Sequence, residues 1–186
     1  MTAAHATGSA GQELKWVQRS ARKQAYELRA EEEVIGSLVW QRGSLAVGET
    51  ADRRWTLKRE GFWHPRVTVR VQDSELNIAV FHPSWRGGGI LELTNGRILR
   101  FKAANLWRSQ WDWQEAEGDA LVRFRSQRGF FKSGADLEIT SAAAGFPELS
   151  LLAVLGWYLI VLGDRDSAAS GSSAAVIAAT SSTSSS

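Results

Sequence analysis

The chain offers few side chains whose types and spacing could catalyse a reaction. Its histidines are His5, His64 and His82, and the last two each precede a proline. Two His-Pro turns could meet and hold a metal ion, but neither belongs to a spaced ligand motif, so we expect them to pack in turns. The chain has no cysteine, which excludes thiolate nucleophiles, zinc-thiolate sites and disulfides.

The glycine-rich and acidic segments also lack catalytic spacing. The run Trp85-Arg-Gly-Gly-Gly-Ile90 has no lysine and does not lead from a strand into a helix, as a phosphate-binding loop would. Glu115 and Glu117 lie in a polar segment, where solvated charge is expected rather than acid-base catalysis. We therefore expect a protein that is not an enzyme and that uses no cofactor and no metal ion.

The basic residues are patterned more regularly. In three predicted strands, two of them lie on the same face with apolar neighbours between. Outward rows of guanidinium groups suit bidentate contacts with phosphate, which predicts an anion-binding or lipid-binding surface. An ordinary solvated exterior is the alternative. The candidates for anion or lipid binding are Arg66, Arg70, Arg97, Arg100, Lys102, Arg123 and Arg125.

Length and composition indicate what kind of folded domain positions these residues. The chain has 186 residues, of which 44% are apolar and 23% charged, with a net charge of +2. These values fit one folded domain. Residues 1–12 lack charged side chains and an apolar run, which predicts a disordered leader rather than a secretion signal. The Ser/Ala-rich residues 167–186 predict a disordered tail, which leaves residues 13–166 as the domain.

Between Trp16 and Ser141 polar and apolar residues alternate almost throughout, which predicts half-buried antiparallel strands. Asn95-Gly96 lies between two β-rich runs and predicts a hairpin with a type I′ turn. Regular turn signals divide this region into about twelve strands. The strands are expected near residues 14–19, 24–30, 33–40, 44–50, 53–59, 66–72, 76–82, 89–94, 97–102, 107–114, 119–126 and 134–141.

The nine tryptophans are the main core material in this scheme. Trp107, Trp111 and Trp113 share one parity, which predicts that all three indoles lie on one face of a single strand. A stacking platform for nucleic-acid bases is the alternative, but 22 basic residues are balanced by 20 acidic ones. We therefore expect no nucleic-acid partner.

A different pattern follows residue 146 and predicts a helix at about residues 147–162. Pro147 and Glu148 suit its first turn and Gly163 its end. From Leu149 to Leu162 only Ser150 is clearly polar, so the helix must be enclosed on all sides. About twelve strands closed into a barrel can enclose it. The predicted fold is mainly β, a closed antiparallel barrel around a C-terminal hydrophobic helix.

Small side chains recur on this helix at every third position. Ser150, Ala153 and Gly156 are predicted to mark where the barrel wall comes closest, so a larger side chain at Gly156 should overpack the core. A membrane span is the alternative for residues 149–162. At about 21 Å they are shorter than the hydrocarbon layer of about 30 Å, which favours the enclosed helix.

The chain resembles the tubby-like C-terminal superfamily, which groups tubby proteins, phospholipid scramblases and plant LURP-one-related proteins. The resemblance covers most of residues 14–163. It rests on about twelve strands before a terminal apolar helix, Phe146 to Leu162, and on the loose spacing of Tyr26-Glu-Leu, Gly36-Ser-Leu-Val-Trp40, Ala79-Val-Phe and Ile90-Leu-Glu-Leu. It implies a helix threaded through a closed barrel, with phosphoinositides bound by basic residues as in tubby proteins. The chain lacks the cysteines and the acidic loop of scramblases, so scramblase activity is not expected.

Together these observations predict a non-enzymatic barrel that binds phospholipid or phosphoinositide headgroups, or another anionic partner, on its outer surface. We expect a cytoplasmic monomer that can associate peripherally with a membrane. One alternative is a protein-interaction or structural module that uses its Ser-rich tail as a tether. Another is a tail-anchored membrane protein, if residues 149–162 span a bilayer.

Overall fold

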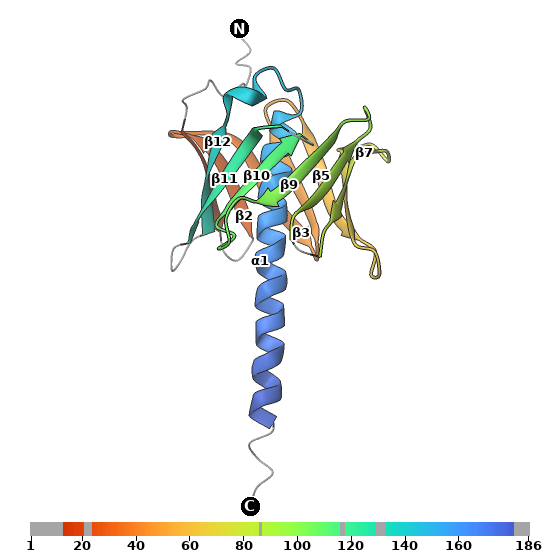
Figure 1. Cartoon of the computed structure of the whole chain (residues 1–186), viewed down its shortest axis with the longest axis vertical. Helices are drawn as coiled ribbons and strands as arrows, with labels where there is room; N and C mark the ends of the chain where they lie inside the picture. The colour runs from red at the N-terminus through yellow and green to blue at the C-terminus, as the bar shows by residue number, and fades with distance from the viewer. Residues whose placement is uncertain (1–12, 21–23, 86, 116–117, 129–132, 181–186) are drawn as a thin grey trace, which may run out of the picture.

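The computed structural model describes residues 13–20, 24–85, 87–115, 118–128 and 133–180, so the predicted leader lies outside the described residues. Twelve antiparallel strands form one closed barrel, and β1 pairs with β12 to complete it (Figure 1). The predicted fold class is confirmed. The strands are β1 (Leu14–Ser20), β2 (Ala25–Ala30), β3 (Glu33–Arg42), β4 (Leu45–Thr50), β5 (Arg54–Glu60), β6 (Arg66–Val71), β7 (Asn77–Pro83), β8 (Gly89–Leu93), β9 (Ile98–Ala103), β10 (Gln110–Glu115), β11 (Ala120–Arg128) and β12 (Ser133–Ile139).

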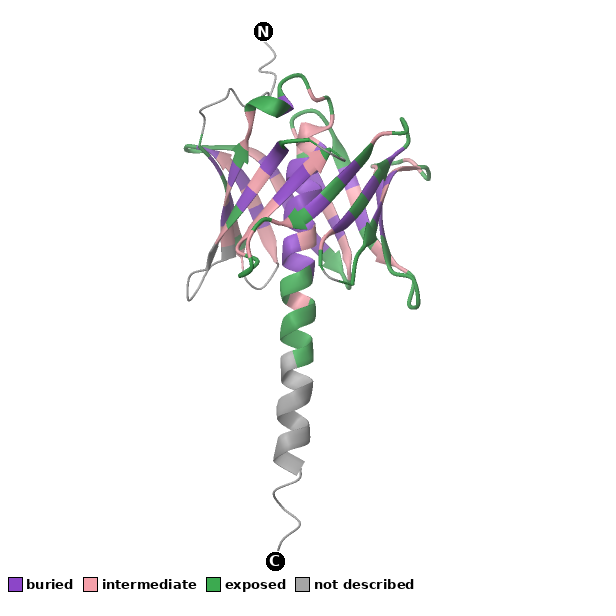
Figure 2. Cartoon of the chain, viewed as in Figure 1, coloured by how far each residue is buried: buried purple, intermediate pink, exposed green. Residues whose placement is uncertain are grey.

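Alternation along each strand separates an apolar interior from a polar exterior. On β5, Trp55 and Leu57 are buried, whereas Lys58 is exposed. Figure 2 shows the same alternation as buried bands between intermediate and exposed ones around the wall. This is the period-two pattern that the sequence predicts, because successive side chains of a strand point to opposite faces.

A short 3-10 helix, η1 (Ser141–Ala143), precedes the single α-helix, α1 (Leu149–Thr180), which runs through the barrel (Figure 1). From Leu151 to Leu162 every residue of α1 except Leu159 is buried. The Trp113 indole on β10 donates a hydrogen bond to the Leu152 carbonyl oxygen at 2.9 Å, and Trp40 stacks on Tyr158 at 5.2 Å. Residues 149–162 therefore pack as the enclosed core helix that the sequence favours.

The predicted close approach of the wall holds at only one of the three small residues. A Cβ atom on Gly156 would lie 2.3 Å from Phe124 and 2.7 Å from the Trp113 indole nitrogen. Ser150 and Ala153 instead line a cavity. A step of three residues turns a helix by about 300°, so these positions drift around the axis and do not share one line of contact.

The helix extends further than predicted. It does not end at Gly163, and the Ser/Ala-rich residues 167–180 are helical rather than a disordered tail; residues 181–186 lie outside the described residues. Once the enclosed turns have formed, extending the helix by one residue costs little free energy, and alanine has the highest helix propensity. Asp166 accepts two hydrogen bonds from the Arg59 guanidinium, which tethers the first turn beyond the barrel to β5.

Trp107 departs from its predicted place. It lies in the loop before β10, where Arg108 has a φ of 51°, and its side chain is 86% exposed. Trp113 is buried and Trp111 is partly buried, so the predicted shared face holds for these two only. In the described part of the chain, no helix combines the length and the hydropathy that a membrane crossing requires.

Candidate anion-binding face

The two ends of the barrel are distinguished by the helix (Figure 1). At the helix-start end, Ser150 on the first turn of α1 donates a hydrogen bond to Asp52 in the β4–β5 turn. At the helix-exit end, the Tyr158 hydroxyl donates to the Ser44 carbonyl oxygen in the β3–β4 turn at 2.6 Å. Because the strands alternate in direction, the loops at residues 61–65, 84–88 and 104–109 also lie at the helix-exit end.

Arg97 is one of three predicted site residues that are engaged within the fold. Its guanidinium donates to the Glu148 carboxylate at 3.2 Å and lies 4.5 Å from the centre of the Phe146 ring. It therefore fixes the segment before α1 at the helix-start end. This pairing leaves little of its charge available for an external anion.

Arg123 and Arg125 on β11 are likewise neutralised. Arg123 contacts Asp112 at 3.2 Å and Glu138 at 3.6 Å, and Arg125 contacts Glu138 at 3.0 Å. Asp112 is only 3% exposed, and its hydrogen bond raises the pKa of Arg123 above the ordinary value. Removing Arg123 would leave a buried carboxylate without its main partner, so we assign this arginine a structural role.

The other four predicted residues lie on one stretch of wall, the β6–β9 face. Its outward side chains are aligned across the strands by the pairs Thr68↔Val80, Val80↔Glu92 and Ile90↔Arg100. The described outward side chains comprise four cations and one carboxylate, a formal charge of +3 with histidine neutral. The face consists of Arg66, Thr68, Arg70, Val80, His82, Ile90, Glu92, Ile98, Arg100 and Lys102.

The cations of this face are weakly paired. Arg70 donates to the neutral amide oxygen of Asn77 at 2.8 Å, and Arg66 is 4.0 Å from Glu60. Among the described residues, neither Arg100 nor Lys102 has a carboxylate within ion-pair distance. With strands about 4.8 Å apart, β6 and β9 are separated by about 14 Å. The face can therefore contact more than one phosphate group at once.

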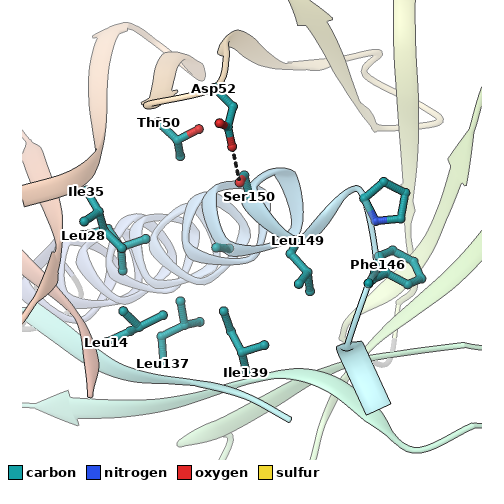
Figure 3. A pocket seen from close by; sticks show the side chains of 13 residues that line it. Leu14, Leu28, Ile35, Thr50, Asp52, Leu137, Ile139, Phe146, Leu149 and Ser150 are labelled. Atoms are coloured by element: carbon teal, nitrogen blue, oxygen red, sulfur yellow. Dashed lines mark hydrogen bonds between the residues drawn. The ribbon is translucent and has the colours of Figure 1, made fainter. Parts of the chain in front are cut away.

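A cavity of about 220 Å³ lies at the helix-start end, beside the first turn of α1 (Figure 3). Most of its lining is apolar, with the hydroxyls of Thr50 and Ser150 and the carboxylate of Asp52 on one side. A second cavity of about 320 Å³ lies across the helix and shares Asp52 and Ser150. The carboxylates of the two linings are Asp52 and Glu148, and Glu148 accepts hydrogen bonds from Asn95 and Arg97.

The two His-Pro turns do not form a metal site in the described structure. His82 on β7 lies 3.8 Å from Glu92, while His64 is exposed in the loop at residues 61–65. In the ranges that the structure describes, no three histidine or acidic side chains are grouped closely enough to hold a metal ion.

The sequence does not predict exposed aromatic residues at the helix-exit end, because its pattern favours the tryptophans as core material. Trp63 and Trp85 are 85% and 87% exposed, and Trp107 is similar. A signal was available: these tryptophans fall among residues such as His64-Pro65 and Gly87-Gly88 that interrupt the alternation, where no strand can turn them inward. Comparisons with protein-family models, curated proteins and solved structures find no match to this chain.

Proposed function

We propose that this protein is a non-enzymatic barrel that binds anionic phospholipid headgroups through its β6–β9 face. The observation that carries the proposal is the charge of that face, +3, with Arg100 and Lys102 lacking carboxylate partners among the described residues. Three other candidates, Arg97, Arg123 and Arg125, are left out because they hold carboxylates of the fold.

The chemistry of these side chains suits phosphate. Guanidinium groups form two parallel hydrogen bonds with phosphate oxygens, and an ammonium group adds a compact charge. Near an anionic membrane each basic residue contributes about 1 kcal/mol, and this attraction falls off within a Debye length of about 10 Å at 0.1 M salt. The sequence resemblance to tubby-like proteins supports the same class of ligand.

Vesicle co-sedimentation tests the proposal. The full chain should bind phosphatidylcholine vesicles that contain phosphatidylserine or a phosphoinositide at low salt, and high salt should weaken this binding. Vesicles of phosphatidylcholine alone should bind much less. Equal binding to anionic and neutral vesicles at low salt would contradict the proposal.

A protein-interaction module is the second candidate, and one observation favours it. Beyond the barrel α1 continues from Asp164 to Thr180, which is about 26 Å at 1.5 Å per residue. A projecting helix of this kind can act as a tether or a contact element. If this is the main function, the chain stays in the supernatant with anionic vesicles at low salt.

A further inference from the structure

Five large apolar side chains gather at the helix-exit end of the barrel, and we call them the aromatic rim. They lie on the loops that join β5 to β6, β7 to β8 and β9 to β10. These loops border the β6–β9 face along that end. The aromatic rim consists of Phe62 at 89% exposure, Trp63 at 85%, Trp85 at 87%, Leu106 at 100% and Trp107 at 86%.

Such exposure is costly, because one tryptophan can remove about 150–250 Å² of surface from water when it is buried. The same barrel buries Trp16, Trp55 and Trp113 almost completely, so apolar rings are not exposed for lack of a core. Exposed apolar side chains of this size on neighbouring loops at one end of a molecule are typical of a surface that contacts another protein or a membrane.

Hydrogen-bonded turns shape two of the three loops of the aromatic rim. In the β7–β8 loop the Ser84 amide donates to the Gly88 carbonyl oxygen at 2.9 Å. Gly88 has a φ of 72°, and a Cβ atom there would clash with the Phe101 carbonyl oxygen. In the β9–β10 loop the Asn105 side chain accepts a hydrogen bond from the Ser109 amide at 3.0 Å. These hydrogen-bonded turns keep the apolar side chains of both loops at the surface.

The geometry points to a lipid bilayer as the surface that covers the aromatic rim: we infer that the rim inserts into the interfacial layer while the β6–β9 face contacts anionic headgroups. This inference deepens the proposed function and rests on it. Indole rings favour the membrane interface, where the ring is apolar and its N–H group meets water or headgroups. The adjoining charge of +3 is complementary to anionic lipid.

The distribution of the rim favours a bilayer over a shaped protein partner. Its apolar side chains project from three separate loops with polar residues such as Ser84 and Asn105 between them. Separate apolar tips can each enter a fluid interface, whereas a protein interface concentrates its apolar groups in one packed centre.

The projecting part of α1 limits how the barrel can approach a membrane. Beyond Gly163, α1 projects about 26 Å from the same end as the aromatic rim (Figure 1) and is exposed or intermediate through Ser170 (Figure 2). It would keep the end of the barrel from lying flat on a membrane. A tilted approach, with the β6–β9 face and its rim loops toward the lipid, avoids this obstruction.

The test compares the full chain with the double variant Trp63→Ser/Trp107→Ser, using vesicles of phosphatidylcholine and phosphatidylserine. Losing two inserted indoles should weaken vesicle binding by about tenfold or more. Binding of soluble inositol hexakisphosphate should be unchanged, because it needs only the basic face. The matched control is Leu76→Ser, which removes a side chain that is 77% exposed in the β6–β7 loop at the opposite end and should leave binding unchanged.

A direct readout of insertion is quenching of tryptophan fluorescence by brominated phosphatidylcholine in the same vesicles. The wild-type chain should be quenched, and the double variant should lose most of that quenching. Anionic-vesicle binding without quenching, or equal affinities of variant and wild type, would overturn the inference while the proposed function survives. Absence of binding to anionic vesicles at low salt would overturn both. A dimer in solution that the double variant dissociates would assign the rim to a second copy and would also overturn the inference.

Discussion

Replacing Gly156 with alanine probes the contact between the helix and the barrel wall most sharply. The added Cβ atom would lie 2.3 and 2.5 Å from two Phe124 ring atoms and 2.7 Å from the Trp113 indole nitrogen. All three distances are far below van der Waals contact. Trp113 cannot move away freely, because its indole donates a hydrogen bond to the Leu152 carbonyl oxygen. Phe124, on the neighbouring strand β11, is fully buried.

The expected magnitude follows from three contributions. Overpacking a well-packed core costs about 1–3 kcal/mol. Weakening the buried hydrogen bond of Trp113 adds about 1 kcal/mol or more. Alanine in place of glycine within a helix gains up to about 1 kcal/mol. We therefore expect Gly156→Ala to lower the free energy of unfolding by about 2 kcal/mol, or the Tm by about 4–8 °C for a domain of this size.

Urea unfolding followed by circular dichroism measures this change. Gly163→Ala is the matched control on the same helix, because no atom lies within 4 Å of its added Cβ. It should leave stability unchanged or raise it by up to about 1 kcal/mol. A Gly156→Ala protein as stable as the wild type would refute the tight contact between α1, β10 and β11.

Three further predictions concern titration, the helix tether and the buried ion pair. Burial raises the pKa of Tyr158 to about 12 and also raises the pKa of Tyr26. Near pH 10 the tyrosines of the denatured chain are half ionised, whereas ultraviolet absorbance should show little tyrosinate in the folded chain. The stability linked to these raised pKa values is fully present below about pH 10 and should be lost as the pH rises toward 12, which denaturant titrations would detect. Asp166→Asn should speed amide hydrogen exchange in the part of α1 beyond the barrel, because it removes the ion pair with Arg59. The free energy of unfolding should change by less than about 1 kcal/mol. Slower or unchanged exchange would argue against the tether to Arg59. Arg123→Gln should destabilise the fold by about 1–3 kcal/mol in urea titrations because it leaves Asp112 buried, and an unchanged stability would contradict its structural role.

The barrel could be predicted from the sequence because its signals are local. Alternation along strands such as β5 indicates which side chains face inward. An apolar run such as that from Leu151 to Leu162 indicates a helix that must be enclosed on all sides. Together these two patterns favour a closed sheet around a helix over a membrane span. The sequence predicts the end of α1 too early because glycine favours the end of a helix, whereas the enclosed turns and the Arg59–Asp166 contact support further helix beyond Gly163.

The candidate site was less predictable because it depends on pairs distant in sequence. Parity along a strand correctly places Arg123 and Arg125 outward, but it does not reveal that Asp112 and Glu138 lie beside them across the sheet. Likewise, the exposure of Trp107 follows from a turn at Arg108 rather than from residue type. The register between strands therefore determines which arginines remain available to bind an external anion.

The vesicle affinity of a charge-neutralising variant tests whether the β6–β9 face binds anionic lipid. In Arg100→Gln/Lys102→Gln, the β6–β9 face loses its two cations without carboxylate partners among the described residues. In Lys15→Gln/Arg125→Gln, the same net charge is removed from β1 and β11 on another part of the wall. We predict that the first variant loses about tenfold or more of its affinity for anionic vesicles and that the second retains most of it. Equal losses in the two variants would show that net charge governs binding and would contradict a specific role for the β6–β9 face.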